Sequence, residues 1–193
     1  MTKALVLFAH PVPESYSAAL HRKVVDTLTA RGWQVDDCDL YAEGFNPVLS
    51  TQERRAYHDT ETNCAPVQPY VDRLRAADAL IMVFPVWNYG YPAILKGYFD
   101  RVFLPGVSFD LSNGSVAPAL QNIQKLAAVT TYGGTRLHSF LAGDPPRKIV
   151  TRALAHISRT NKTRYLALYN MNNATQTRTA AFLTRVGREM ERF

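Results

Sequence analysis

Short, almost entirely apolar segments alternate with amphipathic segments along this chain of 193 residues. The run KALVLFAH at residues 3–10 and the run ADALIMVF at residues 77–84 show no regular polar alternation. Strands of this kind are covered on both faces, as in a parallel sheet whose connections are helices. The pattern therefore predicts an α/β protein with helices on both faces of a parallel sheet.

The segments divide into five expected strands and the helices between them. The expected strands cover residues 3–10, 33–40, 77–84, 125–134 and 163–171. The expected helices cover residues 15–32, a short stretch after residue 50, and residues 66–77, 92–103, 145–159 and 175–193. Five strands suit the flavodoxin-like order 2-1-3-4-5, which binds its ligand at the carboxyl ends of the strands, at the switch point. We expect one such domain over residues 1–193.

Residues typical of helix ends mark several boundaries. Ser15 or Ser17 can cap the first helix, and Gly32 can end it. Ser50 followed three residues later by Glu53 is a capping box.

Two further signals concern the middle of the chain. Pro92 is expected in the first turn of its helix. Asn113-Gly114 is a hairpin-turn signal, so residues 106–121 are predicted to form a small excursion.

Charge and cysteine content narrow the function. The net charge is +6, but the arginines are scattered, without a run of like charge or a nucleic-acid-binding signature. A mildly basic surface suited to anionic small molecules is expected instead. Cys38 and Cys64 form no metal or disulfide pattern. The apolar run at the first residues is too short for a signal peptide, and none approaches a membrane span, so a cytoplasmic location is expected.

The loop after the first strand, AHPVPESYSAAL, places His10, Ser15, Tyr16 and Ser17 where the first helix begins. Unpaired N–H groups and the partial positive charge of a helix start suit a phosphate. The alternative is that the serines are plain helix caps and that the single histidine is a structural residue. Neither a G-x-G-x-x-G nor a P-loop motif occurs in the chain.

The loop after the third strand contains Pro85, Val86, Trp87, Asn88 and Tyr89. Aromatic side chains and main-chain N–H groups together suit a planar heterocycle such as a flavin ring. The alternative is an aromatic corner that packs against a neighbouring helix or subunit.

The loop after the fourth strand contains Thr130, Thr131, Tyr132, Gly133 and Gly134. Paired glycines allow a positive φ and a close approach of the backbone to a ligand. A plain glycine turn is the alternative. Because the ends of strands 1, 3 and 4 converge, the three loops together predict a pocket for a mononucleotide with a flat, wide base.

These segments resemble the NAD(P)H:quinone oxidoreductase-like flavoproteins of flavodoxin-like fold. AHPVPESYSAAL is similar to the family's first strand-end segment, and PVWNYGYPAILKGYFDRVF is similar to its flavin-ring segment. The resemblance spans essentially the whole chain, and residues 84–103 are its most specific part.

The resemblance implies a role for each loop. The first loop would hold the flavin phosphate, residues 85–89 would line the isoalloxazine with N–H groups near N5 and O4, and residues 130–134 would cover its pyrimidine end. It also implies a homodimer and two-electron, ping-pong hydride transfer to quinones, with NAD(P)H as co-substrate.

The chain departs from longer relatives in two respects. Those relatives carry a tail that helps to hold FAD, so FMN is expected rather than FAD. They also place a tyrosine and a histidine beyond the glycine pair. Here Tyr132 precedes the glycines and His138 stands at another distance, so these two are pocket candidates only, and the catalytic residue stays open.

An FMN-dependent NAD(P)H oxidoreductase acting on quinones or similar acceptors is the function that the sequence predicts. Reduction of azo or nitro compounds in the same site is one alternative. A regulatory or ancillary subunit of a membrane transport system is another. A one-electron carrier is disfavoured, because such carriers tend to be acidic and to begin with a Ser/Thr/Gly-rich phosphate loop.

Overall fold

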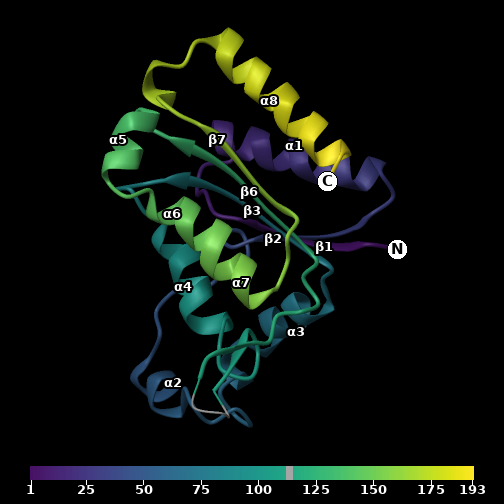
Figure 1. Cartoon of the computed structure of the whole chain (residues 1–193), viewed down its shortest axis with the longest axis vertical. Coiled ribbons are helices and arrows are strands. Elements are labelled where there is room, and N and C mark those ends of the chain that lie inside the picture. Colours follow the sequence, from purple (N-terminus) through teal and green to yellow (C-terminus); the bar gives the residue numbers. More distant parts are fainter. Residues whose placement is uncertain (112–114) are drawn as a thin grey trace.

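The computed structural model describes residues 1–111 and 115–193. Five parallel strands form one sheet in the order β2-β1-β3-β6-β7 (Figure 1). The strands are β1 (Lys3–Phe8), β2 (Gln34–Asp39), β3 (Ala79–Val86), β6 (Lys125–Tyr132) and β7 (Thr163–Leu168). Counted along the chain, these five strands have the order 2-1-3-4-5. The predicted flavodoxin-like fold and strand order are therefore confirmed.

Helices cover both faces of the sheet (Figure 1). One face carries α1 (Tyr16–Ala30) and α8 (Gln176–Glu191). The other carries α3 (Gln68–Ala76), α4 (Ala93–Val102) and a segment made of α6 (Pro145–Lys148), the π-helical η2 (Ile149–Leu154) and α7 (Ala155–Ile157). Short elements complete the chain: α2 (Thr51–Ala56), η1 (Ala65–Val67), β4 (Phe109–Asp110), β5 (Ala117–Pro118), α5 (Arg136–Leu141) and η3 (Met171–Asn173). No helix of the described residues is long and apolar enough to cross a membrane.

Two cores form because successive side chains of a strand point to opposite faces. In β1, Ala4 and Val6 pack toward α1 and α8, whereas Leu5 and Leu7 pack toward α3 and α4. Every residue of β3 is buried. The apolar runs in the sequence therefore reflect a sheet that is covered on both sides.

The predicted helix caps are confirmed. The hydroxyl of Ser15 accepts the N–H of Ala18 at the start of α1. Gly32, with φ of 76°, follows the end of that helix. The capping box of Ser50 and Glu53 begins α2, with both of its hydrogen bonds present.

The aromatic segment begins somewhat differently from the prediction. Strand β3 continues through Pro85 to Val86, two residues beyond the expected end. Pro92 is the N-cap of α4, one residue before the first helical turn. Strands β4 and β5 pair antiparallel, as expected for an excursion. The predicted turn at Asn113-Gly114 lies outside the described residues.

Two helical features differ from the sequence pattern. The expected helix over residues 145–159 is π-helical at residues 149–154, where Val150 and Leu154 nevertheless stay buried. Helix α5 was not expected. Leu137, Phe140 and Leu141 have the i, i+3, i+4 spacing of one helix side, but the segment is only six residues long and that side is exposed, so it adds no buried face to the core. Its cap is Thr135, whose hydroxyl accepts the N–H of His138.

A loop is clamped on α4 by a close backbone contact. A Cβ added to Gly97 would lie 2.5 Å from the Cα of Pro47. The buried guanidinium of Arg101, one turn further on, donates to the carboxylate of Glu53 at 2.5 Å and to the carbonyl of Asn46. This contact fixes the segment that connects β2 with α2 against the helix that follows the aromatic loop.

Replacement of Gly97 by alanine should destabilise the fold, because backbone atoms of Pro47 cannot move aside as a side chain would. We expect a loss of about 2 kcal/mol in the free energy of unfolding, measured by urea titration. Gly187→Ala is the matched control in α8. There the added Cβ meets only the flexible end of Lys23, so stability should stay the same or rise. Equal effects of the two substitutions would contradict this account.

Candidate functional site

A hollow of about 570 Å³ lies at the carboxyl ends of β1, β3 and β6. We call it the main hollow. Most of the residues predicted from the strand-end loops line it, and they are His10, Ser15, Tyr16, Ser17, Pro85, Val86, Trp87, Asn88, Thr131 and Gly133. The structure thus brings the three loops together at the position that the parallel sheet dictates.

The start of α1 forms one end of the main hollow. Ser15 caps the helix, and the N–H groups of Tyr16 and Ser17 make no hydrogen bond within the described residues. The hydroxyl of Tyr16 donates to the carbonyl of Thr179 at 2.7 Å, which holds its side chain toward α8. Burial raises the pKa of Tyr16 to about 12, so it stays protonated. Free N–H groups at the start of a helix can bind an anion.

His10 stands between this helix start and the aromatic loop. The N–H of Val12 donates to its Nδ1 at 3.0 Å, so the ring carries its proton on Nε2. Burial lowers the pKa of His10 from 6.5. Its ring meets the edge of Trp87 at 5.7 Å between centroids. His10 is therefore a neutral donor through Nε2.

The aromatic loop is a tight turn. The N–H of Trp87 donates to the carbonyl of Gly90 at 3.1 Å, and the N–H of Gly90 donates back at 2.8 Å. Asn88 and Tyr89 between them have φ of 49° and 59°, as in a type I′ turn. Their own N–H groups make no hydrogen bond within the described residues. Trp87 and Tyr89 are 42% and 47% exposed. The turn thus presents two free donors beside two open aromatic rings.

A second hollow of about 250 Å³, the side hollow, adjoins the main hollow. The two share Val86, Asn88, Gly133 and Asn172. The side hollow is completed by the other predicted residues Tyr89, Tyr132 and Gly134, together with Ser139. The end of β6 therefore serves both hollows.

The glycine pair matters because it lacks side chains, and not because it adopts an unusual backbone conformation. Neither Gly133 nor Gly134 has the positive φ that glycines allow. Positive φ values occur instead at Asn88 and Tyr89. A Cβ on Gly133 would lie 3.3 Å from Nδ2 of Asn172. Because Gly133 has no side chain, a narrow space stays free between the end of β6 and Asn172 of η3. We call this space the glycine strip.

Tyr132 is held rigidly at the floor of the side hollow. Its hydroxyl lies 2.6 Å from a carboxylate oxygen of Asp144 and 2.6 Å from the hydroxyl of Tyr165. Its ring stacks on Tyr169 at 4.6 Å. Burial strongly raises the pKa of Tyr132, so it stays protonated. Because the hydroxyl is already hydrogen-bonded in this network, Tyr132 lines the side hollow with its ring and is not free to donate a proton to a ligand.

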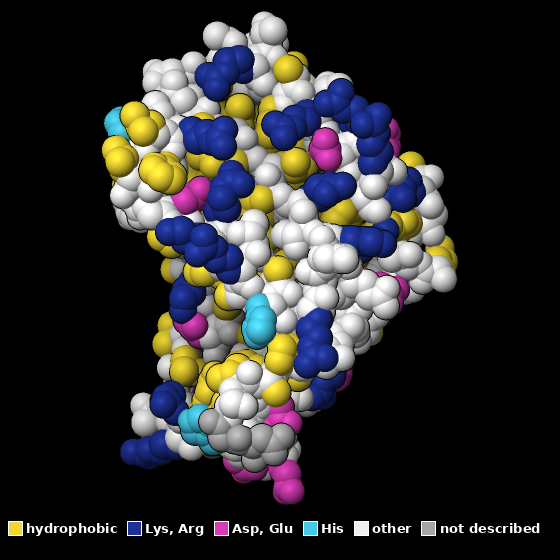
Figure 2. Space-filling model, viewed as in Figure 1, with side chains coloured by type: hydrophobic (Ala, Val, Ile, Leu, Met, Phe, Trp, Pro, Cys, Tyr) yellow, Lys and Arg dark blue, Asp and Glu magenta, His cyan; other side chains and the backbone are white. Residues whose placement is uncertain are grey.

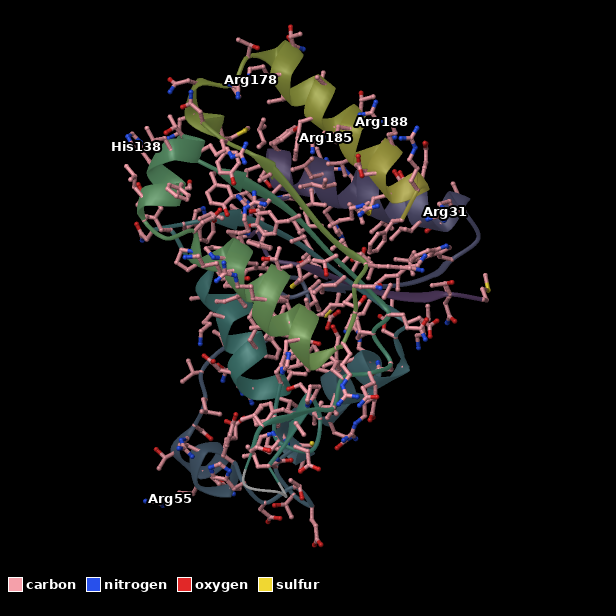
Figure 3. The ribbon with its side chains drawn as sticks, viewed as in Figure 1. Arg31, Arg55, His138, Arg178, Arg185 and Arg188 are labelled. Atoms are coloured by element: carbon pink, nitrogen blue, oxygen red, sulfur yellow. The ribbon has the colours of Figure 1, made fainter. Side chains whose placement is uncertain are left out.

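Two predicted residues lie apart from both hollows. Thr130 is fully buried inside the sheet, and its hydroxyl has no partner among the described residues. His138 is exposed on α5, and Figure 3 shows it pointing outward. Its position one helical turn beyond Gly134 turns the ring away from the side hollow.

The sequence reasoning missed Met171, Asn172 and Ser139, which also line the hollows. The first two follow β7, and the N–H of Asn170 donates to the carbonyl of Gly134 at 2.7 Å. The rule that strand ends converge would have found this fourth loop, had it been applied to the fifth strand. Ser139 belongs to α5, the helix that was not expected.

The chain belongs to the family described as "Flavodoxin-like fold", whose model matches residues 2–189. It is 31% identical over 153 residues to NAD(P)H dehydrogenase (quinone) 1 of Rattus norvegicus, covering 71% of this chain and 56% of that protein. The chain thus spans little more than half the length of this relative.

Two solved structures share the fold across the whole chain. Smu.1420 from Streptococcus mutans UA159 has a TM-score of 0.88 at 27% identity, with 100% of both chains covered. The FMN-dependent NADH-azoreductase from Bacillus anthracis, solved in complex with FMN, has a TM-score of 0.80 at 14% identity and covers 100% of this chain and 99% of that chain.

The pKa of His10 should lie below 6.5, because burial disfavours the imidazolium. The native protein then binds fewer protons than the unfolded chain between the two pKa values. The contribution of His10 to stability is therefore present above about pH 6.5 and is lost as the pH falls through its native pKa. NMR of labelled histidines, assigned with His10→Gln, measures the titration. A value above 6.5, or a proton on Nδ1, would contradict the geometry.

Proposed function

We propose that this protein is an FMN-dependent NAD(P)H oxidoreductase that reduces quinones or similar acceptors by two electrons. The single observation that carries the proposal is the main hollow, which combines an anion-binding helix start with an aromatic turn of free N–H donors. Membership of the flavodoxin-like family, and the similarity to the rat NAD(P)H dehydrogenase (quinone) 1, support it.

The helix start is suited to the FMN phosphate. The free N–H groups of Tyr16 and Ser17 would bind its oxygens, and Nε2 of His10 would add a neutral donor. The partial positive charge of a helix of 15 residues favours the dianion. Among the described residues, no cationic side chain lines the main hollow, so main-chain dipoles would provide the favourable potential.

The aromatic turn and the glycine strip are suited to the flavin ring. The N–H groups of Asn88 and Tyr89 would bind its polar edge, and Trp87 would contact its apolar edge. Because Gly133 has no side chain, its backbone could approach the ring closely. A side chain at this position would contact Asn172 and fill that space. Free donors, an open aromatic and this narrow strip together fit FMN.

Bound FMN supplies the group that accepts hydride from NAD(P)H and passes it to the acceptor. The chain contributes orientation: a turn fixed by two hydrogen bonds, and a Tyr132 wall held by its network. The side hollow is the place where the nicotinamide and the acceptor would bind in turn, which is consistent with a ping-pong scheme.

The exposed apolar residues of α5 favour a homodimer. Leu137 and Leu141 are 64% and 71% exposed, and their i, i+4 spacing places them on one side of the helix. Exposed apolar groups beside a pocket are typical of a subunit interface. The buried free thiols Cys38 and Cys64 agree with a reducing compartment such as the cytoplasm.

Reduction of azo compounds in the same hollows is the second candidate. It is favoured by the shared fold with the FMN-dependent NADH-azoreductase, and conjugated azo compounds are planar, as quinones are. Both activities need the same ring-binding geometry, so only the acceptor distinguishes them.

The purified protein should be yellow, or should become yellow with FMN, and should oxidise NADH or NADPH in the presence of a simple quinone. Absorbance near the flavin bands and at the nicotinamide band gives both measurements. A colourless protein that takes up no FMN would refute the proposal. A yellow protein without turnover of quinones or azo dyes would favour a regulatory role.

Substitution in the main hollow should release FMN without unfolding the chain. Trp87→Ala removes an open aromatic contact, and we expect about tenfold weaker FMN binding. Gly133→Val fills the strip beside Asn172 and should abolish binding. Fluorescence titration gives the dissociation constants, circular dichroism reports the fold, and Gly187→Ala is the control. Loss of the fold in the first variant would instead make Trp87 a packing residue.

A further inference from the structure

A third hollow, of about 260 Å³, lies between α5 and the segment that begins with α6. Four cationic side chains line it: Arg136, Arg147, Lys148 and Arg152. Asp144 is the one carboxylate that lines it in the part of the chain that the structure describes. We call it the basic hollow. In Figure 2, Lys and Arg side chains gather over this region beside the hydrophobic side chains of α5.

The charges of the basic hollow are not balanced. Asp144 is already neutralised by Nε of Arg147 at 2.9 Å. Arg147 is further fixed, because it donates to the hydroxyl of Tyr169 at 2.7 Å and lies over the ring of Tyr165. Arg136, Lys148 and Arg152 have no acidic partner within residues 1–111 and 115–193. Three uncompensated cations that line one small hollow favour an anion with more than one charge.

An open aromatic face completes the basic hollow. Phe140 lines it and is 74% exposed, which is unusual for so large an apolar side chain. Its spacing of four residues from Arg136 places both on one side of α5, next to the side that carries Leu137 and Leu141. A flat ring beside cations suits a ligand that is both aromatic and anionic.

The basic hollow is joined to the side hollow by the tyrosine network. Tyr132 lines the side hollow, and its partners Asp144 and Tyr169 line the basic hollow. The N–H of Asp144 also donates to the carbonyl of Ser139, another residue of the side hollow. A ligand that reaches across the short helix α5 would therefore contact both.

We propose that the basic hollow binds the 2′-phosphoadenosine end of NADPH and makes the protein prefer NADPH over NADH. Phe140 contacts the adenine, and Arg136, Lys148 and Arg152 bind the 2′-phosphate. The nicotinamide then lies toward the side hollow. This inference rests on the proposed function for the identity of the ligand, but the site is defined by its own residues.

The test compares the FMN-loaded protein with the double variant Lys148→Gln/Arg152→Gln. Isothermal titration with adenosine 2′,5′-bisphosphate should show binding that weakens about tenfold in the double variant, because two charge-assisted contacts are lost. The KM for NADPH should rise similarly and the KM for NADH should change little. The control Arg185→Gln/Arg188→Gln removes the same charge from α8, away from the hollow (Figure 3), and should leave both constants unchanged.

Several outcomes would overturn the inference. One is that adenosine 2′,5′-bisphosphate does not bind. Another is that ADP binds as tightly as the bisphosphate, or that inorganic phosphate displaces the bisphosphate at the same concentration. Either of these last two results would show a general anion site. Equal losses of bisphosphate affinity in the two double variants would show that only the net charge of the protein matters, and not the residues of the basic hollow. The NADPH-to-NADH preference could also stay unchanged while quinone turnover continues, and then the inference fails but the proposed function stands. If turnover is absent yet bisphosphate binding is lost only in Lys148→Gln/Arg152→Gln, the proposed function fails and the basic hollow stands.

Discussion

The burial of the sheet on both faces determines where this protein can have a polar site. All of β3 is buried, and its backbone groups pair with β1 on one side and β6 on the other. A polar ligand could contact main-chain groups in the middle of such a sheet only by breaking the hydrogen bonds between neighbouring strands. In the three inner strands, only the ends have main-chain groups that are not paired with a neighbouring strand. The register brings the ends of β3 and β6 level, because Val86 pairs with Tyr132, whereas β1 ends opposite Val83, three residues earlier.

The turn that follows β3 holds strain at this position. Asn tolerates a positive φ because its short polar side chain interacts locally, but Tyr89 does so at a cost of about 1–3 kcal/mol. Such a conformation persists only if its surroundings fix it, as the two hydrogen bonds between Trp87 and Gly90 do. In this turn the N–H groups of Asn88 and Tyr89 make no hydrogen bond within the described residues, so they stay free for a ligand.

The sequence was sufficient for the features that depend on local pattern and on the general behaviour of parallel sheets. Apolar runs predicted the strands, Ser15 and the Ser50–Glu53 pair predicted helix starts, and strand-end convergence predicted the main hollow. It was insufficient where packing decides. Helix α5 has no buried apolar face to announce it, and Gly133 is required by its distance from Asn172, which is 39 positions away in the sequence.

The same distinction explains the tyrosines and the positive charge. Tyr132 was noticed beside the glycines, but its partners Asp144, Tyr165 and Tyr169 come from three later segments, and only the fold shows that its hydroxyl is occupied. A net charge of +6 likewise indicated anionic ligands without naming a residue. In the folded chain the cations differ in what they do. Arg73 of α3 pairs with Asp36 of β2 and with Glu43, and Arg101 of α4 pairs with Glu53 of α2, whereas the cations of the basic hollow exceed the acidic groups around them. Because a concave surface focuses the field of unpaired charges, this small excess attracts an anionic nucleotide more effectively than the same charge spread over α8.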